Sequence, residues 1–195
     1  MATLLYIRDA KEKNLLLLGF NEEGDSASYK VSRAFYSEIG SPMRNEEVSE
    51  EIMCEIRLRD EYFRAKAKAL SYLSYSDVSE RGLSDKLCRA GFSREISIEV
   101  SREMVSLGYI DEVRQIERLV LEEANRKLRG PMKILPFISA KGYSPRRVRE
   151  VMSSLCDTGD IDFSENAERL IKKRLSEQAS VEERKKLLYR NGFKV

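Results

Sequence analysis

The residues best suited to chemistry in this sequence are cations, and most of them gather in one stretch. Between Ala124 and Arg149 the chain has eight Lys or Arg residues and no Asp or Glu, although the two signs are mixed elsewhere. Ammonium and guanidinium groups bind phosphates and carboxylates through charge-assisted hydrogen bonds. We therefore predict that this stretch binds phosphates or an acidic protein surface. Its cations are Arg126, Lys127, Arg129, Lys133, Lys141, Arg146, Arg147 and Arg149.

A second basic group follows in the last part of the chain. Arg169, Lys172 and Lys173 are spaced i, i+3 and i+4, so they share one face of a helix, and Arg174 lies alongside. Stacking of helical units can align this face with the first basic stretch. A solvated face explains Lys172, Lys173 and Arg174 equally well, because lysine and arginine are common on surfaces.

Three of the cations stand where a helix is expected to begin. Arg146, Arg147 and Arg149 follow Ser144, which we predict to cap a helix that has Pro145 at its first position. Cations there are unfavourable, because the exposed amide end of a helix is already positive. A bound phosphate would be favoured at the same end. We infer that binding accounts for these arginines, and we expect them to face solvent.

Other kinds of chemistry have little support. The chain has no histidine, which removes the commonest general base and every zinc site that needs a histidine ligand. Cys54, Cys88 and Cys156 are far apart, and we interpret them as reduced, mostly structural thiols. The chain lacks a phosphate-binding loop, a dinucleotide-binding glycine motif and a nucleophile elbow. We predict no catalytic residue, metal ligand, cofactor or small-molecule substrate.

The elements that must position the cations follow from a repeated phrase. Leu87-Cys88-Arg89-Ala90-Gly91-Phe92 recurs as Ile138-Ser139-Ala140-Lys141-Gly142-Tyr143 and as Leu188-Tyr189-Arg190-Asn191-Gly192-Phe193. The phrase is typical of a helix end at which glycine adopts the left-handed conformation. A recurrence every 50 residues or so indicates a helical repeat protein, since periods of about 20–50 residues mark such folds.

Each phrase belongs to a unit of three helices. Ser79 and Gly130-Pro131 begin the helices that end at the first two phrases, and Ser180 begins the third with a capping box. After the phrase, Ser93 or Ser144 is expected to cap the next helix at once. A unit of about 50 residues cannot bury its apolar face alone, so neighbouring units must stack. We predict a mainly α fold of three tandem three-helix repeats in a curved array.

The core of these units is predicted from helical spacing. Two apolar stripes are expected to be buried: Ile96, Val100, Met104 and Leu107, and Val148, Val151, Met152 and Leu155. The aromatic residues of the repeat could stack on bases, but their fixed places favour core packing. They are Phe92, Tyr109, Phe137, Tyr143 and Phe193.

The N-terminal segment differs from the repeats. Short apolar runs at 3–7 and 14–20 predict a β-hairpin, with a third strand near 29–31 and a helix over 32–39. Asn45 is expected to cap a helix beginning at Glu46 and continuing toward Leu70, with a break near Arg57 to Asp60. An isolated hairpin is marginal in water, so it must dock, most simply on its own helices.

Charge and hydropathy separate the two parts further. Residues 1–60 have eight basic and twelve acidic residues, whereas residues 61–195 have 27 basic and 21 acidic ones. No apolar run approaches the roughly 20 residues that span a bilayer, and the N-terminus lacks secretory-signal features. We expect a cytoplasmic protein without a membrane partner.

The order and spacing of the motifs resemble the RecX family over about residues 61–195. The resemblance rests on Ser79 and Leu83 before Leu87-x-x-x-Gly91-Phe92, on Gly108-Tyr109-Ile110-Asp111-Glu112, on Arg129-Gly130-Pro131 before Lys141-Gly142-Tyr143, and on Arg190-Asn191-Gly192-Phe193. Gly82, Pro136 and Phe137 depart from the family pattern, and Pro136 should kink or shorten its helix.

Membership would imply a bacterial regulator, usually an inhibitor, of the RecA recombinase. The resemblance implies binding to the RecA filament on single-stranded DNA, suppression of its ATP hydrolysis and strand exchange, and some direct affinity for DNA. It places the protein in DNA recombination, DNA repair and the SOS response, without enzymatic activity of its own.

The expected organisation has five parts: an N-terminal segment at 1–44, bridging helices at 45–76, and repeats at 61–110, 111–161 and 162–195, the last of them truncated. Two other functions stay open. One is a stand-alone DNA-binding or transcriptional module with helix-turn-helix-like units, and the other is a purely structural helical adaptor.

Overall fold

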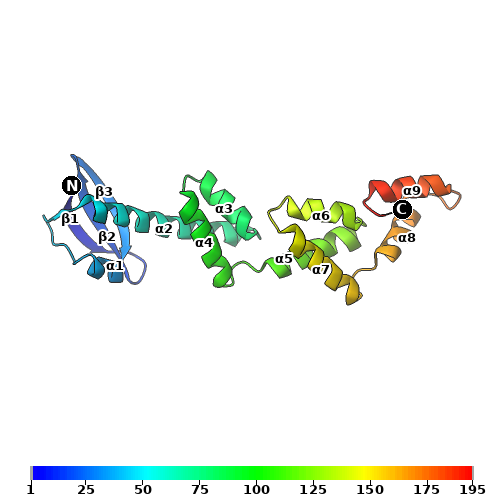
Figure 1. Ribbon diagram of the computed structural model, residues 1–195, viewed down its shortest axis with the longest axis horizontal. Helices are drawn as coiled ribbons and strands as arrows, with labels where there is room; N and C mark the ends of the chain where they lie inside the picture. The colour runs from blue at the N-terminus through cyan, green and yellow to red at the C-terminus, as the bar shows by residue number, and fades with distance from the viewer. Residues whose placement is uncertain (1, 195) are drawn as a thin grey trace. The chain divides into compact units, whose positions relative to one another are not determined.

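The computed structural model describes residues 2–194 (Figure 1). It divides into two compact units, of which the first contains the residues up to Ser71 together with Leu87–Val100. The second contains Tyr72–Lys86 and the residues from Ser101 onward. Within the described part of the chain, no helix combines the length and the apolar character needed to cross a membrane.

The first unit is built on an antiparallel sheet with the strand order β3-β2-β1-β4. Its strands are β1 (Ala2–Asp9), β2 (Leu15–Glu22), β3 (Asp25–Ser32) and β4 (Glu47–Val48). Glu23 and Gly24 connect β2 to β3 with φ of 54° and 102°. Two consecutive positive φ values are typical of the tight hairpin turn that matches strand twist. The hairpin and third strand predicted from the sequence are confirmed.

Two helices cover this sheet and complete its core. Helix α1 (Arg33–Glu38) is capped by the Ser32 hydroxyl, and helix α2 (Glu50–Tyr75) begins after β4. Phe35 of α1 and Met53 of α2 are buried in one apolar cluster with Phe20 of the sheet. The sheet therefore docks on helices of its own chain, as the marginal stability of an isolated hairpin requires.

The helix predicted to start at Asn45 is wrong in its first residues. Glu47 and Val48 form β4 and pair with Thr3 and Ala2 of β1, and α2 begins only at Glu50. The free edge of β1 offers unpaired backbone groups, and pairing with them outweighs a weak local helix signal. The expected break near Arg57 is also wrong, since α2 runs through it without interruption.

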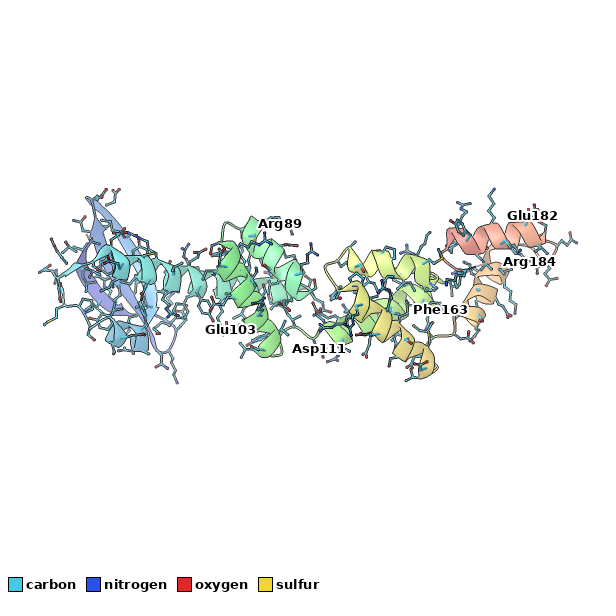
Figure 2. All side chains as sticks on the ribbon, in the orientation of Figure 1. Arg89, Glu103, Asp111, Phe163, Glu182 and Arg184 are labelled. Atoms are coloured by element: carbon cyan, nitrogen blue, oxygen red, sulfur yellow. The ribbon has the colours of Figure 1, made fainter. Side chains whose placement is uncertain are left out.

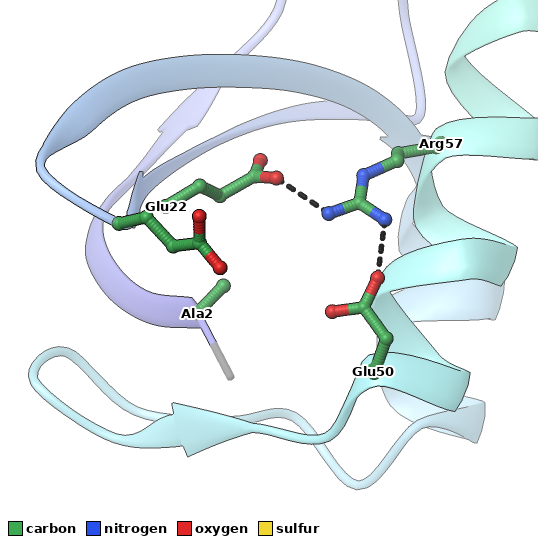
Figure 3. Close-up of a pocket in the computed structure, with 5 residues that line it drawn as sticks. Ala2, Glu22, Glu50 and Arg57 are labelled. Carbon is green, nitrogen blue, oxygen red and sulfur yellow. Dashed lines mark hydrogen bonds and ion pairs between the residues drawn. The ribbon is translucent and has the colours of Figure 1, made fainter.

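Arg57 ties α2 to the end of the sheet (Figure 3). Its guanidinium donates to Glu22 at 2.5 Å and to Glu50 at 2.6 Å. The Tyr29 hydroxyl donates to the same Glu22 carboxylate, and this bond is the main cause of a lowered Glu22 pKa, with Arg57 adding to it. Glu22, Glu50 and Arg57 line a pocket of about 300 Å³ together with Ala2 and Glu23, so two of its three carboxylates are engaged in holding the unit together.

The helical part consists of tandem three-helix repeats. After α2 come α3 (Glu80–Arg89), α4 (Arg94–Ser106), α5 (Glu112–Leu121), the π-helical turn η1 (Glu122–Arg126), α6 (Pro131–Ser139), α7 (Pro145–Asp157), α8 (Phe163–Arg174) and α9 (Val181–Arg190). The expected boundaries at 61–110, 111–161 and 162–195 stay a prediction.

The repeated phrase ends helices as predicted. Gly91, Gly142 and Gly192 have φ of 94°, 96° and 88°. At the third phrase the Phe193 amide donates to the Leu188 carbonyl at 3.1 Å, which satisfies one of the carbonyls left free at a helix end. The predicted left-handed glycines are confirmed.

The phrase also docks on the start of the middle helix of the preceding repeat. The Gly130 amide donates to the Asn191 carbonyl at 2.8 Å, and the Met132 amide donates to the Gly192 carbonyl at 3.0 Å. A Cβ on Gly130 would lie 2.2 Å from the Gly192 carbonyl oxygen, so only glycine fits there.

The second phrase makes the corresponding contact one repeat earlier. The Ser79 hydroxyl donates to the Lys141 carbonyl at 2.9 Å and accepts from the Gly82 amide at 3.1 Å. A Cβ on Gly142 would lie 2.5 Å from that hydroxyl. Gly82, which departs from the family pattern, therefore stands beside a packed contact.

Several local predictions in the repeats are wrong. Pro136 does not end its helix, because α6 runs from Pro131 to Ser139 across it, and the alternative that it kinks the helix stays a prediction. Ser144 occupies the cap position of α7 without a side-chain cap bond. The buried Ser93 hydroxyl has no hydrogen-bond partner among residues 2–194 either. Leu107 of the first apolar stripe is 54% exposed, although Val100 and Met104 of that stripe are fully buried.

Candidate anion-binding surface

The structure brings one cation of the first basic stretch beside three cations of the second in one cleft. The segment around η1 and helix α8 line a shallow hollow of about 380 Å³, to which we refer as the basic cleft. Arg126 comes from the first basic stretch, whereas Arg169, Lys172 and Lys173 come from the second. The remaining lining residues are Asn125 and Leu128. All six residues belong to the second unit, so the cleft needs no contribution from the first.

A chain of amides fixes one wall of the basic cleft. Asn166, which is 2% exposed, donates from Nδ2 to Asn125 Oδ1 at 2.9 Å. Asn125 Nδ2 in turn donates to the Asp160 carbonyl at 2.9 Å, and Arg169 donates from Nη1 to Asn166 Oδ1 at 3.0 Å. The neutral partners hold the Arg169 guanidinium in place without cancelling its charge.

The cations divide into those with and those without a carboxylate partner. Lys127, Arg129, Arg146 and Arg147 form ion pairs with acidic side chains. Among residues 2–194, no ion pair is found for the other eight. These are Arg126, Lys133, Lys141, Arg149, Arg169, Lys172, Lys173 and Arg174, and all are exposed. Uncompensated, exposed cations attract polyanions more strongly than paired ones.

Two cations of the first stretch hold the protein together around Glu123. This side chain is 1% exposed, and its carboxylate accepts from Lys127 Nζ at 2.7 Å and from Arg129 Nη1 at 2.5 Å. The bond to Glu123 is the main cause that raises the pKa of Lys127, and a bond to Glu122 adds to it. Lys127 and Arg129 therefore compensate a buried charge, which is costly to leave alone.

The arginines at the start of α7 also have partners within the chain. Arg147 donates to Glu112 at 2.6 Å, and the other Glu112 oxygen accepts from the Glu80 amide at 3.1 Å. Arg146 pairs with Glu150 one turn along α7 at 2.8 Å. The sequence does not show which carboxylates reach these two arginines. That the three arginines of this helix start bind an external anion stays a prediction. Arg149 is exposed, as predicted, and has no ion pair among residues 2–194.

The aromatic residues of the repeat are not uniformly core residues. Tyr143 and Phe193 are 4% exposed, as expected, and Phe193 packs edge-on against Phe163. Figure 2 labels Phe163 at the start of α8. Tyr109 and Phe137 are 56% and 36% exposed. Core packing was therefore wrong for the last two, and the position in the repeat does not decide burial.

Sequence reasoning missed the residues that build the cleft wall. Asn125 and Asn166 lie 41 residues apart and show no motif or periodicity of their own. Glu112 and Glu123 were missed for the same reason, since a carboxylate is unremarkable until its cation partner is known. Within the described range, no group of three or more His, Cys, Asp or Glu side chains is placed to hold a metal ion. Cys54, Cys88 and Cys156 are free thiols, and they are exposed rather than structural.

Comparison with known proteins finds relatives that share one description. No protein-family model matches the chain. A protein of Clostridioides difficile described as "Regulatory protein RecX" is 31% identical over 144 residues, which is 74% of this chain and 66% of that protein. A protein of Bacillus licheniformis with the same description is 24% identical over 77% of this chain and 58% of its own length. The chain thus matches two thirds or less of these relatives' length.

A solved structure shows the same fold over the whole chain. The crystal structure of a regulatory protein RecX superposes with a TM-score of 0.72 and covers 100% of this chain and 95% of its own. The sequence identity is 20%, so this likeness concerns the fold.

Proposed function

Because this chain belongs to the RecX family of regulatory proteins, we propose that it regulates the RecA recombinase by binding the RecA filament on single-stranded DNA. The expected effect is inhibition of the filament's ATP hydrolysis and strand exchange, without enzymatic activity of the regulator itself. The proposed place of action is the cytoplasm. A filament of this kind carries both protein surface and DNA phosphates, which suits a partner with uncompensated cations.

The basic cleft is the observation that carries this proposal. It collects four exposed cations from two repeats, and none of them is in an ion pair among residues 2–194. The amide chain through Asn125 and Asn166 holds Arg169 beside the other cations. Because Arg169 is positioned in advance, it loses little freedom on binding, so more of its attraction appears as affinity.

The proposal is tested by titrating the protein into a RecA ATPase assay on single-stranded DNA. We expect ATP hydrolysis to fall as the protein is added. The double variant Lys172→Glu, Lys173→Glu should need a several-fold higher concentration for the same effect. The matched control is Lys185→Glu, Lys186→Glu on α9, which makes the same charge change at two exposed positions outside the cleft.

Two outcomes would overturn the proposal. One is unchanged ATP hydrolysis at a several-fold excess of folded protein over RecA. The other is an equal loss of activity in both double variants, which would remove the cleft from the interaction. A steep salt dependence of DNA binding with a preferred sequence and no response to RecA would instead favour a stand-alone DNA-binding module.

A further inference from the structure

Phe137 is an exposed aromatic ring surrounded by cations. It lies on α6, is 36% exposed, and has Lys141, Arg129 and Lys127 at 5.2, 5.4 and 5.9 Å from its ring centroid. Cations within about 6 Å of a ring are attracted to its face. The site thus offers an apolar ring and positive charges. A nucleotide can match both, because its flat base stacks on a ring and its phosphate is negative.

Two of the three cations around the Phe137 ring are held by an ion pair, and the third is not. Glu123 holds Lys127 and Arg129 through its buried carboxylate. Lys141 forms no ion pair with any residue in the described range. Its long side chain can therefore leave the ring for a phosphate, while Glu123 keeps Lys127 and Arg129 in place beside the ring.

The same short segment connects Phe137 to the basic cleft. Arg126 lines the cleft, and the next residue, Lys127, lies against Phe137. Leu128, which follows, is buried with a φ of 52°, a conformation that is strained for a non-glycine residue. The π-helical turn η1 ends at Arg126, and such turns are frequent at functional sites. Arg126 and Lys127, which are adjacent in the chain, thus contribute to the basic cleft and to the surroundings of Phe137, respectively.

We propose that Phe137 is the stacking platform for an unpaired base of single-stranded nucleic acid, whose phosphates bind Lys141 and, one step along the strand, Arg126 in the basic cleft. This inference rests on the proposed role on filaments assembled on single-stranded DNA. A phenyl ring has no hydrogen-bonding group, so the site accepts any base through its flat face. An acidic peptide would use the cations without needing the exposed ring.

The chain contains no tryptophan, which allows a direct test. Phe137→Trp places a single indole at the platform, and stacking of a base on an indole quenches its fluorescence. The matched control is Tyr189→Trp, at an exposed aromatic position near Lys185 and Lys186 of α9. Each variant is titrated without RecA, first with oligothymidylate and then with an oligomer of the same length that has abasic sugars in place of the thymidines.

We expect oligothymidylate to quench Phe137→Trp and to leave Tyr189→Trp unchanged. The abasic oligomer, which keeps the phosphates, should quench neither variant. Phe137→Ala should weaken oligothymidylate binding about 5-fold or more relative to the unaltered protein, and leave the binding of the abasic oligomer unchanged.

Three results would overturn the proposal: no quenching at position 137, equal quenching at both positions, or equal affinity of the unaltered protein for the two oligomers. Polyglutamate is added as a competitor of oligothymidylate. If Phe137→Ala weakens the binding of polyglutamate as much as it weakens that of oligothymidylate, the site is assigned to an acidic protein instead. The ATPase titration is independent of these measurements. Inhibition of RecA without stacking removes only this inference, and stacking without any effect on RecA removes only the proposed function.

Discussion

Replacing Glu123 with glutamine should destabilise the second unit, and by far more than the same change at the adjacent Glu122. The Glu123 side chain is 1% exposed and bonds Lys127 and Arg129. Glutamine keeps the volume but replaces one acceptor oxygen with an NH2 donor that faces a cation. The variant therefore removes the compensating charge and leaves two donors opposed to each other.

The magnitude follows from the burial of the three groups. Removing one partner of a buried ion pair costs about 3–5 kcal/mol when the other stays buried. Lys127 and Arg129 are 44% and 35% exposed, so water can recover part of that loss. We therefore expect a decrease of about 2 kcal/mol in the free energy of unfolding, near the cost of an unsatisfied buried polar group. With a slope near 2 kcal/mol per molar urea, the midpoint falls by about 1 M.

The measurement is urea unfolding followed by circular dichroism on the unaltered protein and on both variants. Glu122→Gln is the matched control, because it removes the same charge one residue earlier from a carboxylate that is 40% exposed and lies 3.1 Å from Lys127. The control should shift the midpoint little, since exposed ion pairs contribute little. Equal midpoints for the two variants would refute the idea that the ion pairs of Glu123 contribute more to the free energy of unfolding because this carboxylate is buried.

Three further results are expected. Leu155→Ala should lower the free energy of unfolding by about 2–5 kcal/mol, because the side chain is buried in the core of the second repeat, and an unchanged melting temperature would contradict this. Arg147→Ala should destabilise by about 1 kcal/mol through loss of its charged hydrogen bond to a nearly buried carboxylate, whereas Arg149→Ala should leave the melting temperature unchanged and serves as its control. The bond from the Ser180 amide is the main cause that lowers the pKa of Glu183. The capping box therefore stabilises α9 fully at pH values above the ordinary glutamate pKa, and this stabilisation is lost as the pH falls through the lowered pKa. Hydrogen exchange of the α9 amides should become faster on acidification, and Glu183→Gln should make the exchange less dependent on pH.

The repeats could be predicted because their signals are local. A glycine in the left-handed conformation, a capping box at Ser180 and an apolar stripe such as Val148 to Leu155 each depend on residues within a few positions of one another. The helix start at Asn45 failed, because the backbone of β1, more than forty residues away in the chain, competes for Glu47 and Val48. Tertiary pairing of this kind overrides a weak local preference.

The position of the basic residues was visible in the sequence, but their roles were not. The acid-free stretch shows where cations concentrate, and it contains Arg126 of the cleft as well as Lys127 of the buried ion pair. Nothing local separates these two neighbours. The packing of the repeats makes the difference, because Arg126 lies beside residues of α8 whereas Lys127 meets Glu123 and Phe137.

The sequence by itself determined the repeat, the ends of its helices and the region where positive charge gathers, since these depend on residue types over short spans. Only the tertiary structure decided which cations are free, because Glu112 meets Arg147 across 35 residues of chain. It also decided that Phe137 is exposed among cations while Tyr143 and Phe193 are buried. Coulomb attraction and burial depend on distance in space, and that distance is set when the repeats pack.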